Sequence, residues 1–207
     1  MIVIFGPLKG STTSTVTGFQ DSALDVYTVV PGVNQGLVSG KIFTCTTSTT
    51  GPTNPTNGVN AASCAKATQA RLDAQTAYLD LAGRPNSGLP TPANLANQTL
   101  APGVYKAPSG SFLIEGGDLT LDAQGDPNAV FIFQLGSALT TASASQVRMI
   151  NGGQSCNIFW QIGSSATMGT GSRFLGNVLA SSSVTMTTGT SSTGRLIALN
   201  GAVTLDG

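Results

Sequence analysis

The stretch NIFWQIGSSATMGTGSRFLGNVLASSSVTM, residues 157–186, contains two kinds of short segment that follow each other twice. One kind is a run of large apolar residues, as in IFWQI and NVLA. The other is a threonine between two mostly apolar residues, as in Ala166-Thr167-Met168 and Val184-Thr185-Met186. Glycine and serine separate the segments, which is typical of short strands joined by tight turns. The stretch therefore predicts a repeating β structure made from two types of strand.

The same two segment types recur outside this stretch. Further threonine segments are centred on Thr120, Thr140 and Thr204, and further apolar runs are VFIFQL (130–135) and RLIAL (195–199). The last three threonines of the series are 18 and 19 residues apart. Two strand types that alternate at such a spacing favour a β-solenoid, in which each coil is one repeat, although regular spacing alone also fits an antiparallel sandwich.

One helix is expected, over residues 60–82, because the row AASCAKATQARLDAQTAYLDLA contains no glycine or proline. Apolar residues recur there at steps of three and four and form a stripe: Ala67, Ala70, Ala74, Ala77 and Leu81. Runs such as VFIFQL are apolar on both faces, so one of these faces needs a cover outside the solenoid. The helix is the natural cover, and we expect it to lie along the solenoid axis.

Strand alternation gives the threonine segments an outward face. If Val184 and Met186 point inward, the residues between and beside them point outward. The same phase in each segment gives a set of exposed positions with hydroxyl or small side chains: Thr120, Thr140, Ser165, Thr167, Ser183, Thr185, Thr187, Ala202 and Thr204. Threonine is stiff at χ1, so a stacked array loses little entropy when it binds a rigid, repetitive and uncharged ligand such as ice. Threonine is also a good strand former, so the pattern alone leaves open a structural, adhesive or carbohydrate-binding solenoid without enzymatic activity.

Composition argues against several classes of function. The chain has 207 residues, with nine basic residues, nine acidic residues and no histidine. Without a basic field we expect neither nucleic acid nor a membrane as a partner. Without histidine the chain lacks the commonest general base and metal ligand. The acidic residues Glu115, Asp118, Asp122 and Asp126 give only one partial copy of a calcium-binding repeat. We therefore expect no metal, no cofactor and no enzymatic activity.

Cys45 and Cys64 flank a segment rich in threonine, proline and asparagine. A disulfide between them would pin this loop and indicate an oxidising compartment, and two unpaired thiols are the alternative. Cys156 lies in an apolar setting and is expected to be a small buried residue, as Trp160 is expected to be part of the core. The opening residues MIVIF do not have the arrangement of a signal peptide.

Five long segments resemble the DUF3494 family of ice-binding proteins, and they occur in the family's order. These segments are LAGRPNSG (81–88), LAPGVYKAPSGSF (100–112), DPNAVFIFQLGSALTTASAS (126–145), CNIFWQIGSSATMGTGSRFLGNVLA (156–180) and GRLIALNGAVTLDG (194–207). The resemblance implies a discontinuous triangular β-solenoid, which we expect to be right-handed, with one long α-helix packed alongside. It also implies a secreted antifreeze protein that adsorbs to ice, and we expect a monomer with a single domain over residues 1–207.

In the family, the ice-binding face lies on strands with the pattern Thr-Ala/Gly-x-Thr/Asn. The matching positions here are Ser182-Ser183-Val184-Thr185 and Gly201-Ala202-Val203-Thr204. The last position is threonine in both copies, and the first is threonine in neither. The segment 45–59 stands where the family has a capping loop, so we expect it to cover one end of the solenoid.

Overall fold

The computed structural model describes residues 18–27, 36–45 and 61–206. This part of the chain forms two compact units, residues 18–73 and residues 74–206, and each is described by itself. The predicted single domain over 1–207 stays a prediction.

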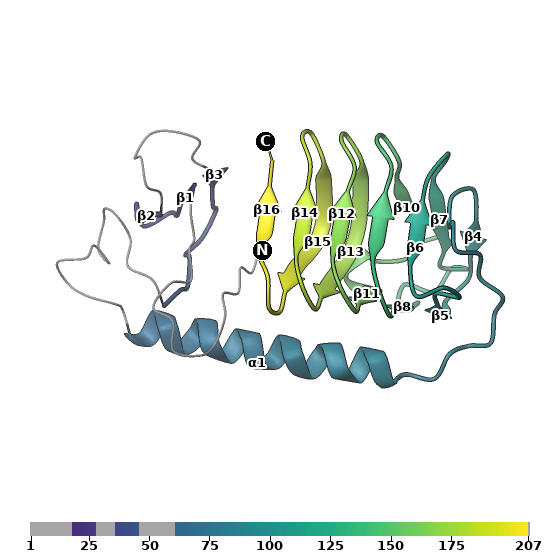
Figure 1. The fold of residues 1–207 in the computed structure, drawn as a ribbon, viewed down its shortest axis with the longest axis horizontal. Coiled ribbons are helices and arrows are strands. Elements are labelled where there is room, and N and C mark those ends of the chain that lie inside the picture. The colour runs from purple at the N-terminus through teal and green to yellow at the C-terminus, as the bar shows by residue number, and fades with distance from the viewer. Residues whose placement is uncertain (1–17, 28–35, 46–60, 207) are drawn as a thin grey trace. The chain divides into compact units, whose positions relative to one another are not determined.

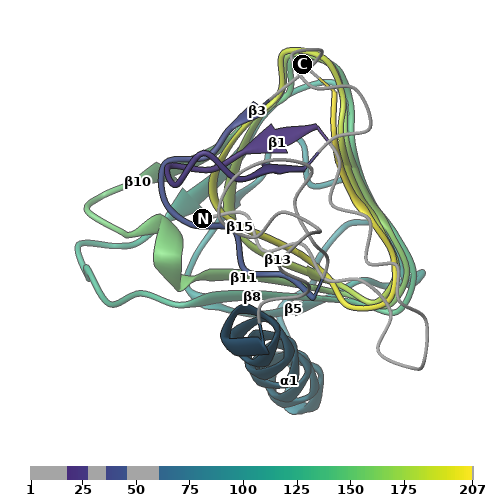
Figure 2. The same ribbon diagram turned by 90° about the vertical axis from the view of Figure 1, so that its left-hand side faces the viewer.

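The 74–206 unit is a coil of short strands in three sheets, and every strand pair within these sheets is parallel (Figure 1). We call them the helix-side sheet, which lies beside the helix, the threonine sheet, which contains the threonine segments from Thr140 onward, and the third sheet. Figure 2 looks along this coil and shows its three-sided outline. Over the described residues, the expected mostly β fold with parallel sheets and one α-helix is confirmed, and right-handed winding stays a prediction.

In each of the three sheets, the strands lie side by side in the order in which they follow along the chain. The helix-side sheet contains β5 (Gly103–Lys106), β8 (Phe131–Leu135), β11 (Ile158–Ile162), β13 (Arg173–Ala180) and β15 (Ser191–Ala198). The threonine sheet contains β6 (Phe112–Ile114), β9 (Leu139–Thr141), β12 (Ala166–Met168), β14 (Val184–Met186) and β16 (Val203–Leu205). The third sheet contains β4 (Thr99–Leu100), β7 (Leu119–Asp122) and β10 (Val147–Ile150).

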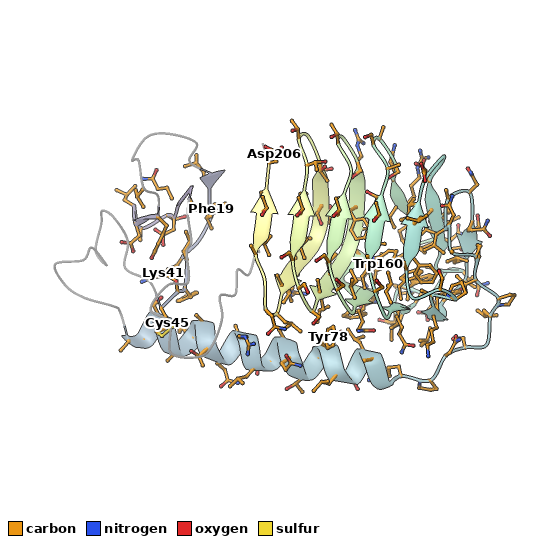
Figure 3. The ribbon with its side chains drawn as sticks, in the orientation of Figure 1. Phe19, Lys41, Cys45, Tyr78, Trp160 and Asp206 are labelled. Atoms are coloured by element: carbon orange, nitrogen blue, oxygen red, sulfur yellow. A yellow bond between two sulfur atoms is a disulfide. The ribbon has the colours of Figure 1, made fainter. Side chains whose placement is uncertain are left out.

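A column of aromatic rings runs through the core of the earlier coils. Tyr105, Phe133 and Trp160 pair in register across β5, β8 and β11. Their rings stack, with centroids 5.4 Å apart for Tyr105–Phe133 and 4.0 Å apart for Phe133–Trp160. Trp160 is fully buried and donates its indole N–H to the carbonyl of Leu175 (Figure 3). The prediction that Trp160 belongs to the core is confirmed.

Strands β13 and β15 are long because each turns a corner of the coil. Arg173 at the start of β13 bridges to Gln146 beside the third sheet, whereas Val178 later in the strand pairs with β11 of the helix-side sheet. Within β15, Gly194 has a φ of +150°, and a Cβ atom there would lie 2.0 Å from the backbone oxygen of Gly176 in β13. Only glycine fits so close an approach of two backbones.

The helix α1 (Ala61–Gly83) begins and ends within one residue of the prediction. In the 74–206 unit it covers the helix-side sheet through Ala74 and Leu81, which are buried. Gln134 on β8 donates from Nε2 to the carbonyl oxygens of Leu81 and Arg84, each at 2.8 Å, and so ties the end of α1 to the sheet.

The prediction that Ala77 belongs to the apolar stripe of the helix is wrong. Ala77 is exposed, and the half-buried Tyr78 takes its place between Ala74 and Leu81. At 100° per residue, positions 74, 78 and 81 lie close to one line, and Ala77 lies to the side of it.

The 18–73 unit contains a small sheet of β1 (Phe19–Gln20), β2 (Val26–Tyr27) and β3 (Gly36–Leu37). The disulfide between Cys45 and Cys64 is present, which confirms that prediction and rejects the unpaired thiols. Thr44 donates its backbone N–H to Ser63 Oγ at 3.0 Å, beside the disulfide. Residues 46–59 of the predicted capping loop lie outside the described residues, so its capping role stays a prediction.

Cys156 is exposed, so the prediction that it is buried is wrong. It lies in the 3-10 turn η2 (Ser155–Asn157), which precedes β11 and contains no buried residue. The apolar run after it contributes to the interior only from Ile158 onward.

Candidate functional site

The threonine sheet aligns four threonines from four successive coils in one row. Strand pairing places Thr140, Thr167, Thr185 and Thr204 directly opposite one another, with Leu113 ahead of them on β6. On each strand from β9 to β14 the residues on both sides of the threonine are buried, so the threonine points outward. We call these five residues the middle row.

A second row of small side chains lies two residues before the middle row. Its members are Ser111, Ala138, Ser165, Ser183 and Ala202. Ser165 Oγ accepts the backbone N–H of Ser183 at 3.4 Å, and Ser183 Oγ accepts that of Ala202 at 3.3 Å. These serine hydroxyls therefore link each coil to the next along the row, which we call the leading row.

A third row lies two residues after the middle row. Its members are Glu115, Ala142, Gly169, Thr187 and Asp206. Thr187 donates its hydroxyl to the carbonyl oxygen of Met168 at 2.8 Å, which holds this threonine against the neighbouring coil. The only charges in this trailing row are on its first and last members, Glu115 and Asp206.

The three rows together form what we call the threonine wall. Apart from Leu113 and the two charged end members Glu115 and Asp206, its side chains end in hydroxyl or methyl groups or are hydrogen only. Its rows repeat at the spacing of paired strands, about 4.8 Å from coil to coil. Threonine has few χ1 rotamers, so the wall presents hydroxyl and methyl groups with little freedom to lose on binding. Such a surface suits a ligand that is itself flat, uncharged and periodic.

Eight of the nine residues predicted from the sequence belong to the wall. These are Thr140, Ser165, Thr167, Ser183, Thr185, Thr187, Ala202 and Thr204. Thr120 does not, and its predicted place in the row is wrong. It lies on β7 of the third sheet, where it pairs with Thr99 and Arg148. The residue of its coil that faces Thr140 is Leu113, because each coil contributes one strand to each sheet.

Sequence reasoning missed the part of the wall that carries no threonine. Leu113, Ser111, Ala138, Ala142 and Gly169 follow from the same alternation once the register of β6, β9 and β12 is known. Asn94 was also missed, and it bridges to Leu113 beside the start of the middle row. Its side chain donates to the carbonyl oxygen of Glu115 at 2.9 Å and accepts the N–H of Glu115 at 3.1 Å.

The departure from the family pattern at its first position has a steric reason in one copy. At Gly201, a Cβ atom would lie 2.8 Å from the backbone of Ser182 and 2.4 Å from Ser183 Oγ. A threonine there would force the last two coils apart, whereas Ser182 occupies the same position one coil earlier.

The third sheet has a different surface, with charged groups and longer turns. Arg148 forms an ion pair with Asp118. A hydrogen bond from the side chain of Asn151 lowers the pKa of Asp122, and a further bond from the N–H of Gln124 acts in the same direction. Within the described residues no three His, Cys, Asp or Glu side chains come together as a metal site would require. This face lacks the flat, uncharged repeat of the threonine wall.

The described part of the chain contains no helix that is long and apolar enough to span a bilayer.

Comparison with known proteins shows the family of this chain. The sequence profile of the family described as ice-binding-like matches residues 3–207. An ice-binding protein of Nostoc sp. (strain HG1) is 46% identical over 207 residues, which span 98% of this chain and 69% of that protein. Ice-binding protein 1 of Shewanella frigidimarina (strain NCIMB 400) is 44% identical over 142 residues, which span 67% of this chain and 16% of that protein.

Solved structures of such proteins have the same fold. The DUF3494 domain of the Shewanella frigidimarina protein is 30% identical with a TM-score of 0.67, and the match covers 98% of this chain and 96% of that domain. An ice-binding protein from an Antarctic biological consortium is 37% identical with a TM-score of 0.68, over 92% of this chain and 80% of the other. The resemblance noted in the sequence is thereby confirmed. This chain belongs to the ice-binding-like family, whose profile covers nearly its whole length.

Proposed function

We propose that this chain is an ice-binding protein that adsorbs to ice through the threonine wall. The observation that supports this most is the register of Thr140, Thr167, Thr185 and Thr204, which places four identical side chains at equal spacing on one side of the coil. The hydroxyl groups join the hydrogen-bonded lattice of the ice surface. The methyl groups order the water molecules between them.

Adsorption would act on ice without any chemical step. A molecule bound at the growth front pins the crystal there, and the ice between pinned points must grow with a curved surface. Curvature makes further growth unfavourable, so the freezing point falls below the melting point and small crystals recrystallise slowly. Each contact is weak, but many contacts form together on a rigid surface, so desorption is slow.

Extracellular location and a monomeric state belong to the same proposal. The Cys45–Cys64 disulfide supports an oxidising compartment, because such bonds do not persist in a reducing cytosol. Ice forms outside cells first, so a secreted monomer would meet its ligand there.

Two measurements on the purified chain test the proposal. The chain should enter a slowly growing ice hemisphere, and it should open a gap between the melting and freezing points of a single crystal. An adhesive or glycan-binding solenoid would stay in the liquid and leave this gap at the buffer value. That result would reject ice binding.

A further inference from the structure

Gly169, in the trailing row, is held by threonine hydroxyls from the coils on both sides of it. Its N–H donates to Oγ1 of Thr141 at 3.0 Å and to the carbonyl oxygen of the same residue at 3.1 Å. Its own carbonyl oxygen accepts from Oγ1 of Thr190 at 3.0 Å. Thr141 ends β9 in the coil before, and Thr190 follows β14 in the coil after. The two side chains therefore hold the two peptide groups that flank Gly169, Thr141 through the N–H and Thr190 through the carbonyl oxygen.

The backbone at Gly169 lies directly on the preceding coil. A Cβ atom at this position would be 2.6 Å from the carbonyl carbon of Ala142 and 2.6 Å from the carbonyl oxygen of Thr141. The distance between Gly169 and the preceding coil is thus set by backbone contact, and the hydroxyl of Thr141 adds to the backbone hydrogen bond that holds the two backbones together.

Thr141 is an unusual residue for its place. It belongs to the inward row Ile114, Thr141, Met168, Met186 and Leu205, in which its neighbours are all apolar. Its side chain is buried, and besides Gly169 it contacts the hydroxyl of the buried Ser172 at 3.4 Å. Valine has the same shape and would fill this space without the need to satisfy a buried hydroxyl. Packing therefore does not explain the hydroxyl group of Thr141, whereas its hydrogen bond to the N–H of Gly169 does.

We propose that Thr141 and Thr190 are positioning residues of the ice-binding surface, which hold Gly169 level with the rest of the threonine wall. This inference rests on the proposed function of the wall. Ice is flat and does not adapt to the protein, so a raised or mobile peptide at the wall's margin would separate neighbouring rows from the lattice. Neither residue touches ice, since Thr141 lies inside the coil and Thr190 binds back to Gly169.

The test uses Thr141→Val, Thr190→Val and the double variant in the full chain. Thr141→Ser keeps the hydroxyl and serves as the conservative rescue. Ser192→Ala removes another buried hydroxyl, one with no hydrogen-bond partner in the described part of the chain, and serves as the matched control. Circular dichroism near 0 °C establishes that each variant is folded. Amide hydrogen exchange at Gly169 and thermal hysteresis are then measured at equal protein concentration.

We expect exchange at Gly169 to accelerate by about fivefold in Thr141→Val, the factor for loss of one ordinary hydrogen bond. Thermal hysteresis should fall in both single variants and fall further in the double variant, with Thr141→Ser and Ser192→Ala at the wild-type level. A merely structural role would lower the melting temperature of the protein and leave hysteresis near 0 °C unchanged.

These measurements distinguish failure of the positioning role from failure of the proposed function. If the wild type has hysteresis and the folded double variant matches it, the positioning role is wrong while the proposed function stands. If the wild type itself has none, the proposed function is wrong. Should Thr141→Val fail to fold, the half-buried Thr190→Val carries the same comparison.

Discussion

Thr167 and Thr185 pair in register across β12 and β14, and each stands between two buried residues of its own strand. Because backbone hydrogen bonds set this pairing, the spacing of the two side chains is a property of the sheet. Thr140 and Thr204 extend the row on either side under the same constraint. The wall therefore needs no flexible loop to arrange its contacts.

Leu113 interrupts the middle row at its start, where its side chain is 38% exposed. We predict that Leu113→Thr extends the row to five threonines and raises thermal hysteresis above the wild-type value at equal concentration. The substitution lies on an exposed strand position, so the free energy of unfolding should change by about 1 kcal/mol or less.

Leu89→Thr is the matched control, because Leu89 is exposed to a similar extent and lies outside the wall. It should leave hysteresis at the wild-type value. Equal hysteresis in Leu113→Thr and the wild type would show that the row does not act as a unit.

Removal of the disulfide should lower the stability of the folded chain without abolishing ice binding. Cys45 and Cys64 close a loop with a sequence separation of 19. We predict that the double change Cys45→Ser and Cys64→Ser lowers the free energy of unfolding by about 3 kcal/mol, measured by urea titration. The wall belongs to the 74–206 unit, so hysteresis near 0 °C should persist.

The exposed thiol provides the control for this experiment. Cys156→Ser should match the wild type in the urea titration. A double variant as stable as the wild type would contradict a stabilising role for the disulfide.

Burial raises the pKa of Tyr105 above its ordinary value near 10. The folded state therefore favours the neutral phenol, and this contribution to stability is complete below pH 10 and is lost as the pH rises through the raised pKa. We predict that the free energy of unfolding falls above about pH 10 and that Tyr105→Phe makes this fall less steep.

At neutral pH, Tyr105→Phe should cost about 1 kcal/mol, because the hydroxyl donates to the carbonyl oxygen of Ala101. Parallel profiles for Tyr105→Phe and the wild type above pH 10 would contradict the prediction.

The sequence predicted the later coils of the wall well, because they are short and regular. Thr167, Thr185 and Thr204 are 18 and 19 residues apart, and each follows an apolar strand that fills the helix-side sheet. The repeat length and the inward–outward alternation along each strand were sufficient to place these three threonines on the wall.

The earlier coils were predicted less well for a physical reason. They are 27 residues long from Leu113 to Thr140 and again from Thr140 to Thr167, because extra residues precede β8 and β11. Leu119-Thr120-Leu121 has the same local pattern as the strands of the wall, and local pattern does not encode which side of a three-sided coil a strand occupies. Pairing across coils decides this, and it assigns Thr120 to the third sheet.

The burial of Cys156 and Ala77 was also predicted wrongly from local sequence. Each was placed in the interior from the character of its neighbours, and each lies just outside the buried surface of its element. Burial at the margin of a strand or helix depends on where the neighbouring element ends, which only the packed structure defines.

The most direct test of the wall compares Thr167→Tyr with Thr193→Tyr. Both threonines are exposed on strands of the coil, but Thr193 lies on β15 away from the threonine sheet. A tyrosine at position 167 would project from the centre of the wall and hold the neighbouring rows away from ice, while the fold has room for it outside. Thermal hysteresis of the two folded variants is the measurement. We predict that hysteresis collapses in Thr167→Tyr and remains at the wild-type value in Thr193→Tyr. Full hysteresis in Thr167→Tyr would contradict ice binding through the threonine wall.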